Sequence, residues 1–234
     1  MSRLSQRTAL RLFKSLSASY DTVLEYVTLF QDRYWKRFLI EEADMKEGLR
    51  VLDLACGTCV LEEYIGGRSC EVVGLDLTEE MIRIGMEKRS PVVSSLVLGD
   101  AESIPFHDEC FDMVLSCYLP KYCRGERLTS EILRVLRPGG RVLLYDFTRP
   151  RGFLGAFHAF YIYGLFRILG FVASHTAQEL EYTFAQLPEI IRESRWEDRL
   201  RVALTKGGFE QIGERVLSAG VVTAIWGTKS PAFL

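Results

Sequence analysis

The stretch "VLDLACGTCVLE", residues 51–62, decides the fold, because it has the pattern of a buried strand, a tight turn and the first turn of a helix. A glycine lies inside the turn at Gly57, and a carboxylate, Asp53, lies in the strand before it. Cys56 and Cys59 allow a second interpretation, a CxxC thiol pair for redox chemistry or metal binding. The two interpretations give different proteins, so the neighbouring chain has to distinguish them.

Apolar runs like the one in this stretch recur along the chain up to residue 148. Each is rich in Val and Leu and bounded by Gly, Asp or Pro, as buried strands of a parallel sheet are. The runs are residues 50–56, 70–77, 94–100, 111–118 and 141–147. Helical stretches such as "TEEMIRIGMEKR" and "GERLTSEILRVLR" separate them, and we expect the second to stop at Pro138-Gly139-Gly140, with a turn after it. This alternation predicts a doubly wound α/β fold.

The chain changes character after Pro150. Residues 153–174, "FLGAFHAFYIYGLFRILGFVAS", are strongly apolar and aromatic, and Phe153, Phe157 and Phe160 share one face of a helix. His158 and Arg167 interrupt the run, so a membrane span is a poor fit. A core helix and a lid over an apolar substrate both remain open.

Two strand-like runs close the chain, residues 210–218 and 221–229, and Ala219-Gly220 between them predicts a hairpin. We expect a single domain of 1–234 with four parts. These are N-terminal helices in 1–45, a ligand-binding core in 50–148, a helical lid in 150–195, and a last helix with the hairpin in 196–234.

Composition excludes several classes of protein. The 29 Lys and Arg against 31 Asp and Glu leave a net charge of -2, which gives no electrostatic footprint for binding nucleic acid. The six cysteines include one CxxC segment but no second one to pair with it, and there are only three histidines. This argues against a metal site or a disulfide framework, so we expect reduced thiols in the cytoplasm. The first 19 residues are basic and lack acids, as in a mitochondrial presequence, but we expect an amphipathic helix there.

Carboxylates stand at the ends of the second and third predicted strands. Asp76, nineteen residues past Gly57, can accept hydrogen bonds from both ribose hydroxyls of an adenosine, or can instead cap the helix that begins near Thr78. Asp100-Ala101-Glu102 can address an adenine amino group by the same geometry. Residues 55–60 hold one glycine where a G-x-G-x-x-G loop has three, so this loop is poorly suited to binding a pyrophosphate. The pattern predicts a site for an adenosine without phosphates.

Four segments together resemble the successive motifs of class I S-adenosylmethionine-dependent methyltransferases. They are "VLDLACGTCVLE", "GLDLTEEMI", "GDAESIPFHDECFDMVLS" and "EILRVLRPGGRVLLYDF". The resemblance implies S-adenosyl-L-methionine as cofactor. It also implies a mostly parallel seven-stranded sheet with a C-terminal antiparallel hairpin and a helical lid insertion after the fifth strand. Family members usually have glycine at the position of Cys59, so the CGTC segment looks like the cofactor loop with one substitution, at a cost of about 1–2 kcal/mol if the backbone there is left-handed.

The same resemblance places the cofactor contacts in the first loop, at the strand ends and near the N-terminus. Asp53 could instead only brace the loop through hydrogen bonds to backbone amides, while Ser116 and Tyr20 could contact the methionine end of the cofactor. The expected cofactor-binding residues are Tyr20, Asp53, Ala55, Cys56, Gly57, Asp76, Leu77, Met81, Asp100, Ala101, Glu102 and Ser116.

Flanking segments resemble one branch of that family, the ubiquinone/menaquinone biosynthesis C-methyltransferases. "LFKSLSASYDTVLEY", "YWKRFLI", "LLYDFTRP" and "SAGVVTAIWGTK" carry this narrower likeness. The chain differs from this branch in the loop after the fourth predicted strand. There Pro120 and Lys121 replace the Arg-Asn pair that members of this branch commonly have. Because that loop faces the substrate, the exact acceptor stays open.

The expected function is methyl transfer to a small, apolar aromatic acceptor such as a prenylated quinol ring carbon. A general base would help by removing a phenol proton, and Asp146, Tyr118 and Lys121 are the candidates. Phe153, Phe157, Phe160 and Tyr161 would form an apolar substrate wall, suited to a prenyl tail and to peripheral membrane contact. A homodimer is compatible with the sequence. The alternatives are O- or N-methylation of another small molecule, a cofactor-binding protein without catalysis, and a thiol oxidoreductase.

Overall fold

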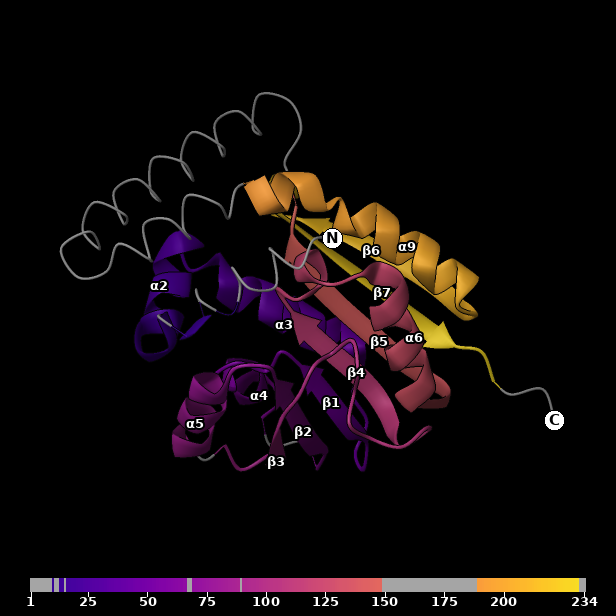
Figure 1. The fold of residues 1–234 in the computed structure, drawn as a ribbon, viewed down its shortest axis with the longest axis horizontal. Coiled ribbons are helices and arrows are strands. Elements are labelled where there is room, and N and C mark those ends of the chain that lie inside the picture. Colours follow the sequence, from indigo (N-terminus) through magenta and orange to yellow (C-terminus); the bar gives the residue numbers. More distant parts are fainter. Residues whose placement is uncertain are drawn as a thin grey trace.

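A seven-stranded sheet forms the centre of the molecule, with strand order β3-β2-β1-β4-β5-β7-β6 (Figure 1). The computed structural model describes residues 10, 13–14, 16–66, 69–88, 90–148 and 189–231. The strands are β1 (Arg50–Leu54), β2 (Glu71–Asp76), β3 (Val93–Leu98), β4 (Phe111–Cys117), β5 (Leu136–Phe147), β6 (Phe209–Leu217) and β7 (Val222–Lys229).

Strand direction follows the expected pattern. β1 pairs in parallel with β2 and β4, β2 pairs in parallel with β3, and β4 pairs in parallel with β5. β7 is antiparallel to both β5 and β6, and the short helix η3 (Ser218–Gly220) forms the turn between the last two strands. The predicted fold class, with its C-terminal antiparallel hairpin, is confirmed. The predicted lid after β5 falls almost entirely outside the described residues.

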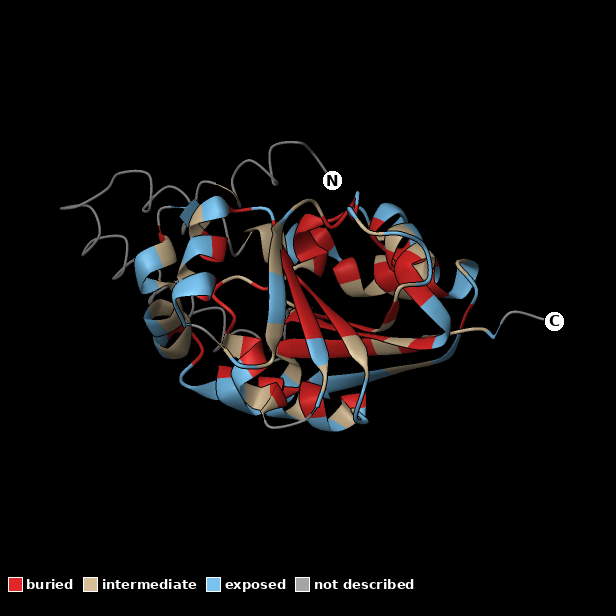
Figure 2. Cartoon of the chain, turned by 90° about the horizontal axis from the view of Figure 1, so that it is seen from below, coloured by how far each residue is buried: buried red, intermediate tan, exposed pale blue. Residues whose placement is uncertain are grey.

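Helices cover both faces of the sheet and create two separate cores (Figure 2). On one face, α3 and α4 bury apolar side chains such as Trp35 and Ile65. On the other face, α6 and α9 bury Leu128 and Leu200. The described helices are α2 (Tyr20–Val27), α3 (Gln31–Ala43), α4 (Val60–Ile65), α5 (Glu79–Lys88), α6 (Gly125–Val135) and α9 (Trp196–Lys206). No described helix is both long and apolar enough to cross a bilayer.

The junction between α6 and β5 differs from the sequence prediction. The helix ends at Val135, and strand pairing already begins at Leu136, which lies opposite Phe111. The register then shifts, so that Arg141 lies opposite Met113, and the Gly139-Gly140 pair falls inside the strand as an irregularity instead of forming a turn. Gly139 has a φ of +78°, a conformation that favours glycine.

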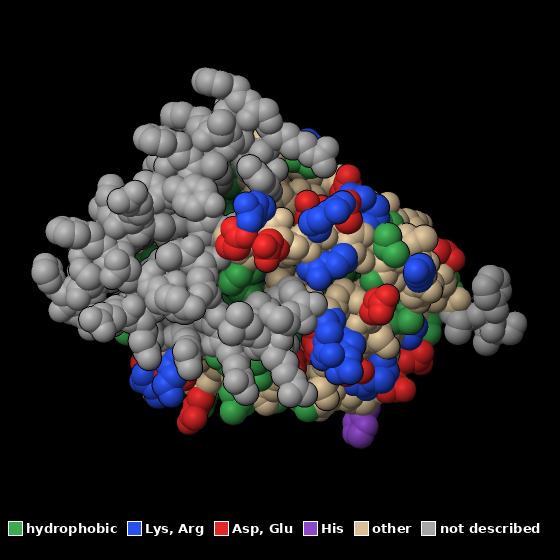
Figure 3. Space-filling view, turned by 45° about the horizontal axis from the view of Figure 1, so that its top comes forward, with side chains coloured by type: hydrophobic (Ala, Val, Ile, Leu, Met, Phe, Trp, Pro, Cys, Tyr) green, Lys and Arg blue, Asp and Glu red, His purple; other side chains and the backbone are tan. Residues whose placement is uncertain are grey.

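The order of the strands creates the crevice in which ligands bind in open α/β sheets. Strand order reverses between β1 and β4, because β2 and β3 lie on one side of β1 while β4 and β5 lie on the other. Ligands bind outside the carboxyl ends of the strands at such a switch point. On one face of the molecule, acidic and basic side chains are interspersed over the described surface (Figure 3).

Candidate functional site

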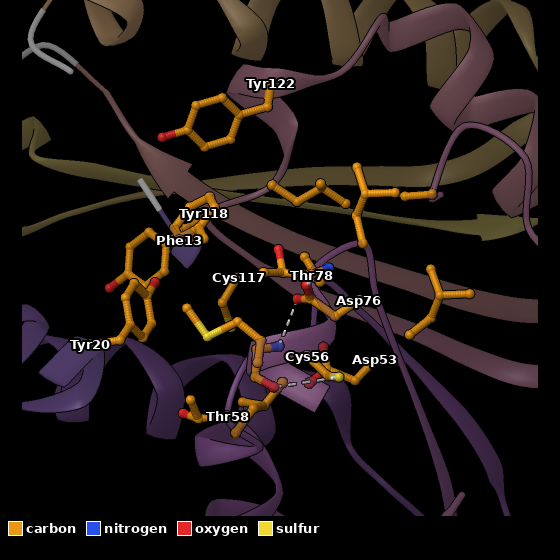
Figure 4. Close-up of a pocket in the computed structure, with 18 of the residues that line it drawn as sticks. Phe13, Tyr20, Asp53, Cys56, Thr58, Asp76, Thr78, Cys117, Tyr118 and Tyr122 are labelled. Atoms are coloured by element: carbon orange, nitrogen blue, oxygen red, sulfur yellow. Dashed lines mark hydrogen bonds between the residues drawn. The ribbon is translucent and has the colours of Figure 1, made fainter. Parts of the chain in front are cut away.

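One cavity opens at the carboxyl ends of β1, β2 and β4, the place where the topology predicts a ligand (Figure 4). It encloses about 1050 Å³ of empty space, part of it open to solvent. Most of the residues expected to bind a cofactor line this cavity. These are Tyr20, Asp53, Ala55, Cys56, Gly57, Asp76, Leu77, Met81, Asp100 and Ala101.

The loop after β1 is fastened to the end of β2 by Asp76. The Gly57 amide donates to Asp76 Oδ2 at 2.9 Å, and the Thr78 amide donates to Oδ1 at 2.8 Å (Figure 4). Burial raises the pKa of the Asp76 carboxyl, while these amide bonds oppose the rise. Each carboxylate oxygen has a second lone pair, so Asp76 can still accept hydrogen bonds from a ligand in the cavity. The aspartate that braces the loop is therefore Asp76, which can also serve the ribose.

Asp53 is placed differently from Asp76. It is buried at the end of β1 and lines the cavity, yet its Oδ1 atom has no hydrogen-bond partner. Burial, together with the negative charge of Glu62, raises the pKa of the Asp53 carboxyl well above its usual range. An unpartnered buried oxygen beside a cavity is costly to leave without a donor, so this atom fits a hydrogen-bonding or cationic ligand group.

Two of the expected cofactor residues do not line the cavity. Glu102 accepts hydrogen bonds from the backbone and guanidinium of Arg124, at 2.5–2.8 Å. Ser116 donates to the carbonyl of Leu54 at 2.5 Å and so ties β4 to β1. Both side chains fix the walls of the site, and Asp100, whose Oδ1 accepts the Glu102 amide, is the third-strand carboxylate that faces the cavity.

The environment of Cys56 and Cys59 favours a packing role over thiol chemistry. Cys56 and Cys59 are buried, and Cys59 has a left-handed backbone with φ of +63° at the start of α4. A hydrogen bond with Cys59, and burial, raise the pKa of the Cys56 thiol well above its usual range. A thiolate, the reactive form, is therefore disfavoured. Among the described residues, no group of His, Cys, Asp and Glu side chains is arranged to hold a metal ion.

The segment before α2 supplies an aromatic wall that faces the strand ends. Phe13 contacts Tyr20 and Tyr122 edge-to-face, with ring centroids 5.7 and 5.8 Å apart (Figure 4). Polar contacts hold the start of α2 against the loop, because Asp21 accepts hydrogen bonds from Thr58 at 2.5 Å and from Lys88 at 2.7 Å. The predicted aromatic wall of Phe153, Phe157, Phe160 and Tyr161 lies outside the described residues.

Tyr118, one of the three candidate bases, lines the cavity at the end of β4. Its hydroxyl donates to Asp32 Oδ1 at 2.6 Å, and Asp32 also accepts from Tyr145 at 3.3 Å and pairs with Lys36. Tyr118 is held in a left-handed conformation, φ of +66°, and its ring stacks on Phe147 with centroids 4.8 Å apart. Burial and the charge of Asp32 raise the pKa of the Tyr118 hydroxyl, so it stays protonated in the free site.

The other two candidate bases, Asp146 and Lys121, form an ion pair at 2.7 Å with almost no exposure, and neither lines the cavity. Lys121 Nζ also donates to the carbonyl of Tyr118 at 2.6 Å, and its backbone amide donates to Asp146 Oδ2 at 2.9 Å. Burial raises the pKa of the Asp146 carboxyl and lowers that of the Lys121 amine, and the partner opposes the change in each case. The pair therefore secures the loop that carries Tyr118.

Several cavity residues were not singled out as site residues from the sequence. Lys36 and Thr58 are polar, whereas Leu24, Leu119 and Tyr122 extend the apolar wall. Only Lys36 carries a local signal, because Asp32 lies four residues before it on one helix face. The rest depend on contacts between distant segments.

The residues present fit S-adenosylmethionine. The Asp76 carboxylate has acceptor capacity left for ribose hydroxyls, and Asp100 with Ala101 is in place for an adenine. The unpartnered Asp53 oxygen is suited to a cationic amino group. An open left-handed glycine, Gly57, at φ of +57°, lets the backbone approach a ligand closely.

Comparison with known proteins gives one family and one fold. A family model described as the ubiE/COQ5 methyltransferase family matches residues 1–229. The ubiquinone/menaquinone biosynthesis C-methyltransferase UbiE of Pasteurella multocida is 32% identical over 96% of this chain and 85% of its own length. The demethylmenaquinone methyltransferase of Paenarthrobacter aurescens is 30% identical over 90% of this chain and 82% of its own length.

Solved structures share the fold at lower identity. Phosphoethanolamine N-methyltransferase 2 of Haemonchus contortus, in complex with S-adenosyl-L-methionine, is 18% identical with a TM-score of 0.59, over 84% of this chain and 52% of that one. A SAM-dependent methyltransferase from Aquifex aeolicus is 19% identical with a TM-score of 0.55, over 82% of this chain and 88% of that one.

Proposed function

Because the chain belongs to the ubiE/COQ5 methyltransferase family, we propose that it methylates a ring carbon of a prenylated quinol. Family membership confirms the broader predictions: the protein is an S-adenosylmethionine-dependent methyltransferase. The finer assignment, a quinol acceptor, is supported by curated relatives that carry this activity in their names.

The observation that carries the proposal is the continuity of the cavity. Its polar part, at the ends of β1, β2 and β3, is suited to the cofactor, and its other wall is aromatic, with Phe13, Tyr20 and Tyr122. A flat aromatic acceptor can pack against such a wall by ring contacts and burial of apolar area. One cavity can therefore hold the cofactor and an aromatic ring side by side.

The chain's own residues divide into binding and proton-handling groups. When bound, S-adenosylmethionine supplies a methyl group on a positively charged sulfur, which a nucleophile can accept directly. Asp76, Asp100 and Ala101 would hold the adenosine, and Asp53 would face the amino-acid end. The remaining requirement is a ring carbon made nucleophilic by loss of a neighbouring phenol proton. After transfer that carbon loses its own hydrogen as a proton and the phenol oxygen regains one, so the aromatic ring is restored and one proton is released overall.

We assign the relay of the phenol proton to Tyr118. Its hydroxyl is bonded to Asp32, so the tyrosine oxygen can take a proton from the acceptor as its own proton passes to the Asp32 carboxylate. Lys36, paired with Asp32, supplies a positive charge that stabilises the carboxylate before transfer. Lys121 and Asp146 contribute by holding Tyr118 in its strained conformation.

A methyl-transfer assay tests the proposal. The protein is incubated with methyl-labelled S-adenosylmethionine and with short-chain demethylmenaquinol, a demethylated ubiquinol precursor, catechol or phosphoethanolamine. We expect label on a ring carbon of the prenylated quinols, located by mass spectrometry and NMR. Transfer to oxygen or nitrogen, or turnover of the other acceptors alone, would favour a different small-molecule methyltransferase. Cofactor binding without transfer to any acceptor would favour a non-catalytic binding protein. Peripheral membrane contact stays a prediction.

A further inference from the structure

Two carboxyl groups meet at the base of the cofactor loop. Asp53 is the penultimate residue of β1 and lines the cavity, while Glu62 lies in the first turn of α4 and does not line it. Both are almost fully buried, at 2% and 1% exposure, and the two side chains lie within hydrogen-bonding reach of each other. Glu62 therefore stands behind Asp53, on the side away from the cavity.

Three of the four carboxyl oxygens of this pair lack hydrogen-bond donors. Asp53 Oδ1 and both carboxyl oxygens of Glu62 have no partner in the structure. Asp76, by contrast, receives two backbone amides. Two buried carboxylates in contact repel each other, and these three oxygens have no donor to replace the water they lost. Such a pair is stable only if it holds a proton or meets a cation.

The groups that face the pair do not neutralise it. Lys36, on α3, is engaged with Asp32, and Lys88, on α5, is engaged with Asp21. The remaining titratable neighbours are thiols, contributed by the loop, the start of α4 and the end of β4: Cys56, Cys59 and Cys117. Burial raises the pKa of Glu62 to about 7 and raises that of Asp53 well above its usual range. Near neutral pH the empty site therefore retains a proton on this pair.

We propose that Glu62 couples cofactor binding to a proton: the ammonium group that Asp53 would meet displaces the proton which the Asp53 and Glu62 carboxyl groups share. Asp53 meets the ammonium group, and Glu62 acts as a positioning residue that supplies the second negative charge from behind. The ammonium group keeps its three hydrogens and donates to the freed carboxylate, and the displaced proton goes to the solvent. This inference rests on the proposed function, because it assumes that the cofactor binds in this cavity.

Calorimetry in several buffers measures the displaced proton directly. S-adenosylhomocysteine is titrated into the protein at pH 7 in buffers of different ionisation enthalpy, so that the slope of the observed enthalpy gives the protons released. The wild type should release a fraction of one proton per site. Glu62→Gln should release far less and should bind about fivefold more weakly at pH 8.5, with equal affinity at pH 6, where Glu62 is protonated in the wild type. Glu63→Gln, at the exposed next position of α4, is the matched control and should behave as wild type.

A second ligand allows the same test on wild-type protein, without any substitution. 5′-Methylthioadenosine carries the adenosine and sulfur but no ammonium group, so wild-type protein should bind it without proton release. Equal release with both ligands would overturn the inference, since the pair would then respond to loop closure alone. Binding of S-adenosylhomocysteine without release would overturn it as well, leaving the proposed function intact. Absence of binding by folded wild type would overturn the cofactor's place in this cavity, and this inference with it.

Discussion

Asp76 accepts hydrogen bonds from the amides of Gly57 and Thr78 while it lines the cavity at the end of β2. Removing its carboxylate therefore affects the ligand twice: the loop loses its brace, and the cavity loses an acceptor. Hydrogen bonds to a charged acceptor contribute about 1.5–3 kcal/mol each.

Asp76→Ala should weaken S-adenosylhomocysteine binding by tenfold or more, about 1.4 kcal/mol. Calorimetric titration measures the affinity, and Glu79→Ala, an exposed carboxylate at the start of α5, is the control. Unchanged affinity in Asp76→Ala would show that neither the brace nor the acceptor contributes to binding.

Glu62 makes the stability of the fold depend on pH. Burial raises its pKa from 4.5 to about 7. A raised carboxyl pKa means that the folded state binds the proton more tightly, so this stabilisation is fully present below pH 4.5 and is lost as the pH rises through about 7. Glu62→Gln keeps the neutral form at every pH.

Glu62→Gln should therefore match the wild type near pH 4.5 and exceed its free energy of unfolding by up to about 3 kcal/mol at pH 8. Urea denaturation between pH 4.5 and 8 measures the difference, and Glu63→Gln should show none of it. A variant less stable than wild type at pH 8 would mean that the charged form of Glu62 has a partner that stabilises it.

Tyr118→Phe separates proton transfer from binding. The phenyl ring preserves the stacking on Phe147 but removes the hydroxyl bonded to Asp32. We expect kcat to fall by about 10²–10⁴-fold, with the affinity for S-adenosylhomocysteine within about twofold of wild type. Tyr122→Phe removes a hydroxyl from the same cavity without affecting the Asp32 contact, and should retain most of the activity. An unchanged kcat in Tyr118→Phe would require another base.

For individual residues, the sequence predicts which side chains lie at the cavity better than it predicts what each side chain does there. Asp53, Gly57 and Asp76 all line the cavity because strand ends converge in a parallel sheet, and their cofactor-binding role stays a prediction. Which aspartate braces the loop depends on the direction of the Gly57 amide, which no local pattern specifies. Glu62 was not singled out, since nothing in "VLEEYI" indicates which of two adjacent glutamates points inward.

Among the secondary-structure elements, the strands were the most predictable feature. Each predicted run became a strand within a few residues. For the central strands β1, β2 and β4 the reason is that burial on both faces requires continuous apolar sequence. The end of α6 was less predictable. Leu136 leaves the helix to pair with Phe111, a contact 25 residues away in the sequence, and this tertiary pairing overrides the Pro138-Gly139-Gly140 signal.

In the C-terminal hairpin, β6 and β7 pack closely at a glycine. Gly213 in β6 lies opposite Trp226 in β7, and a Cβ atom at Gly213 would overlap the indole ring. Gly213→Ala should lower the free energy of unfolding by about 1–3 kcal/mol, measured by urea denaturation. Gly227→Ala, where the added Cβ would meet Phe209 Cβ at an ordinary 3.4 Å, should change it by less than about 1 kcal/mol. Equal effects would indicate that the indole ring can move aside.

In the molecule as a whole, residues that precede the sheet in the sequence form one wall of the cavity. Leu10, Phe13, Tyr20 and Leu24 line it opposite the residues at the strand ends. Asp21 joins the start of α2 to the cofactor loop through Thr58 and to α5 through Lys88, and Lys14 adds an ion pair to Glu80 at 3.0 Å. These contacts are partly exposed, so they contribute little to global stability. They hold the start of α2, and with it the cavity residue Tyr20, against the cofactor loop, so loosening them should speed ligand exchange.

Asp21→Asn should therefore speed dissociation of S-adenosylhomocysteine by about three- to tenfold while changing the free energy of unfolding by less than about 1 kcal/mol. Stopped-flow displacement measures the rate. The difference from wild type should shrink at high salt, which screens exposed ion pairs. Glu63→Gln, whose carboxylate is 4.0 Å from the same Lys88, is the control. An unaltered dissociation rate would mean that the ligand leaves by a path that this segment does not cover.

The left-handed Cys59 also has a consequence for how this loop can change over generations. A Cβ at Gly85 would meet the Cys59 sulfur at 2.7 Å, so this thiol fills the space left by a glycine on α5; a Cβ at Gly74 would meet both Leu96 Cδ2 at 2.5 Å and the Cys56 sulfur at 2.8 Å. A larger residue at 85 is tolerated only after 59 becomes smaller. Positions 59 and 85 should therefore vary together among descendants of this chain, and a mutagenesis library that changes one of them at a time would miss the combinations that still fold.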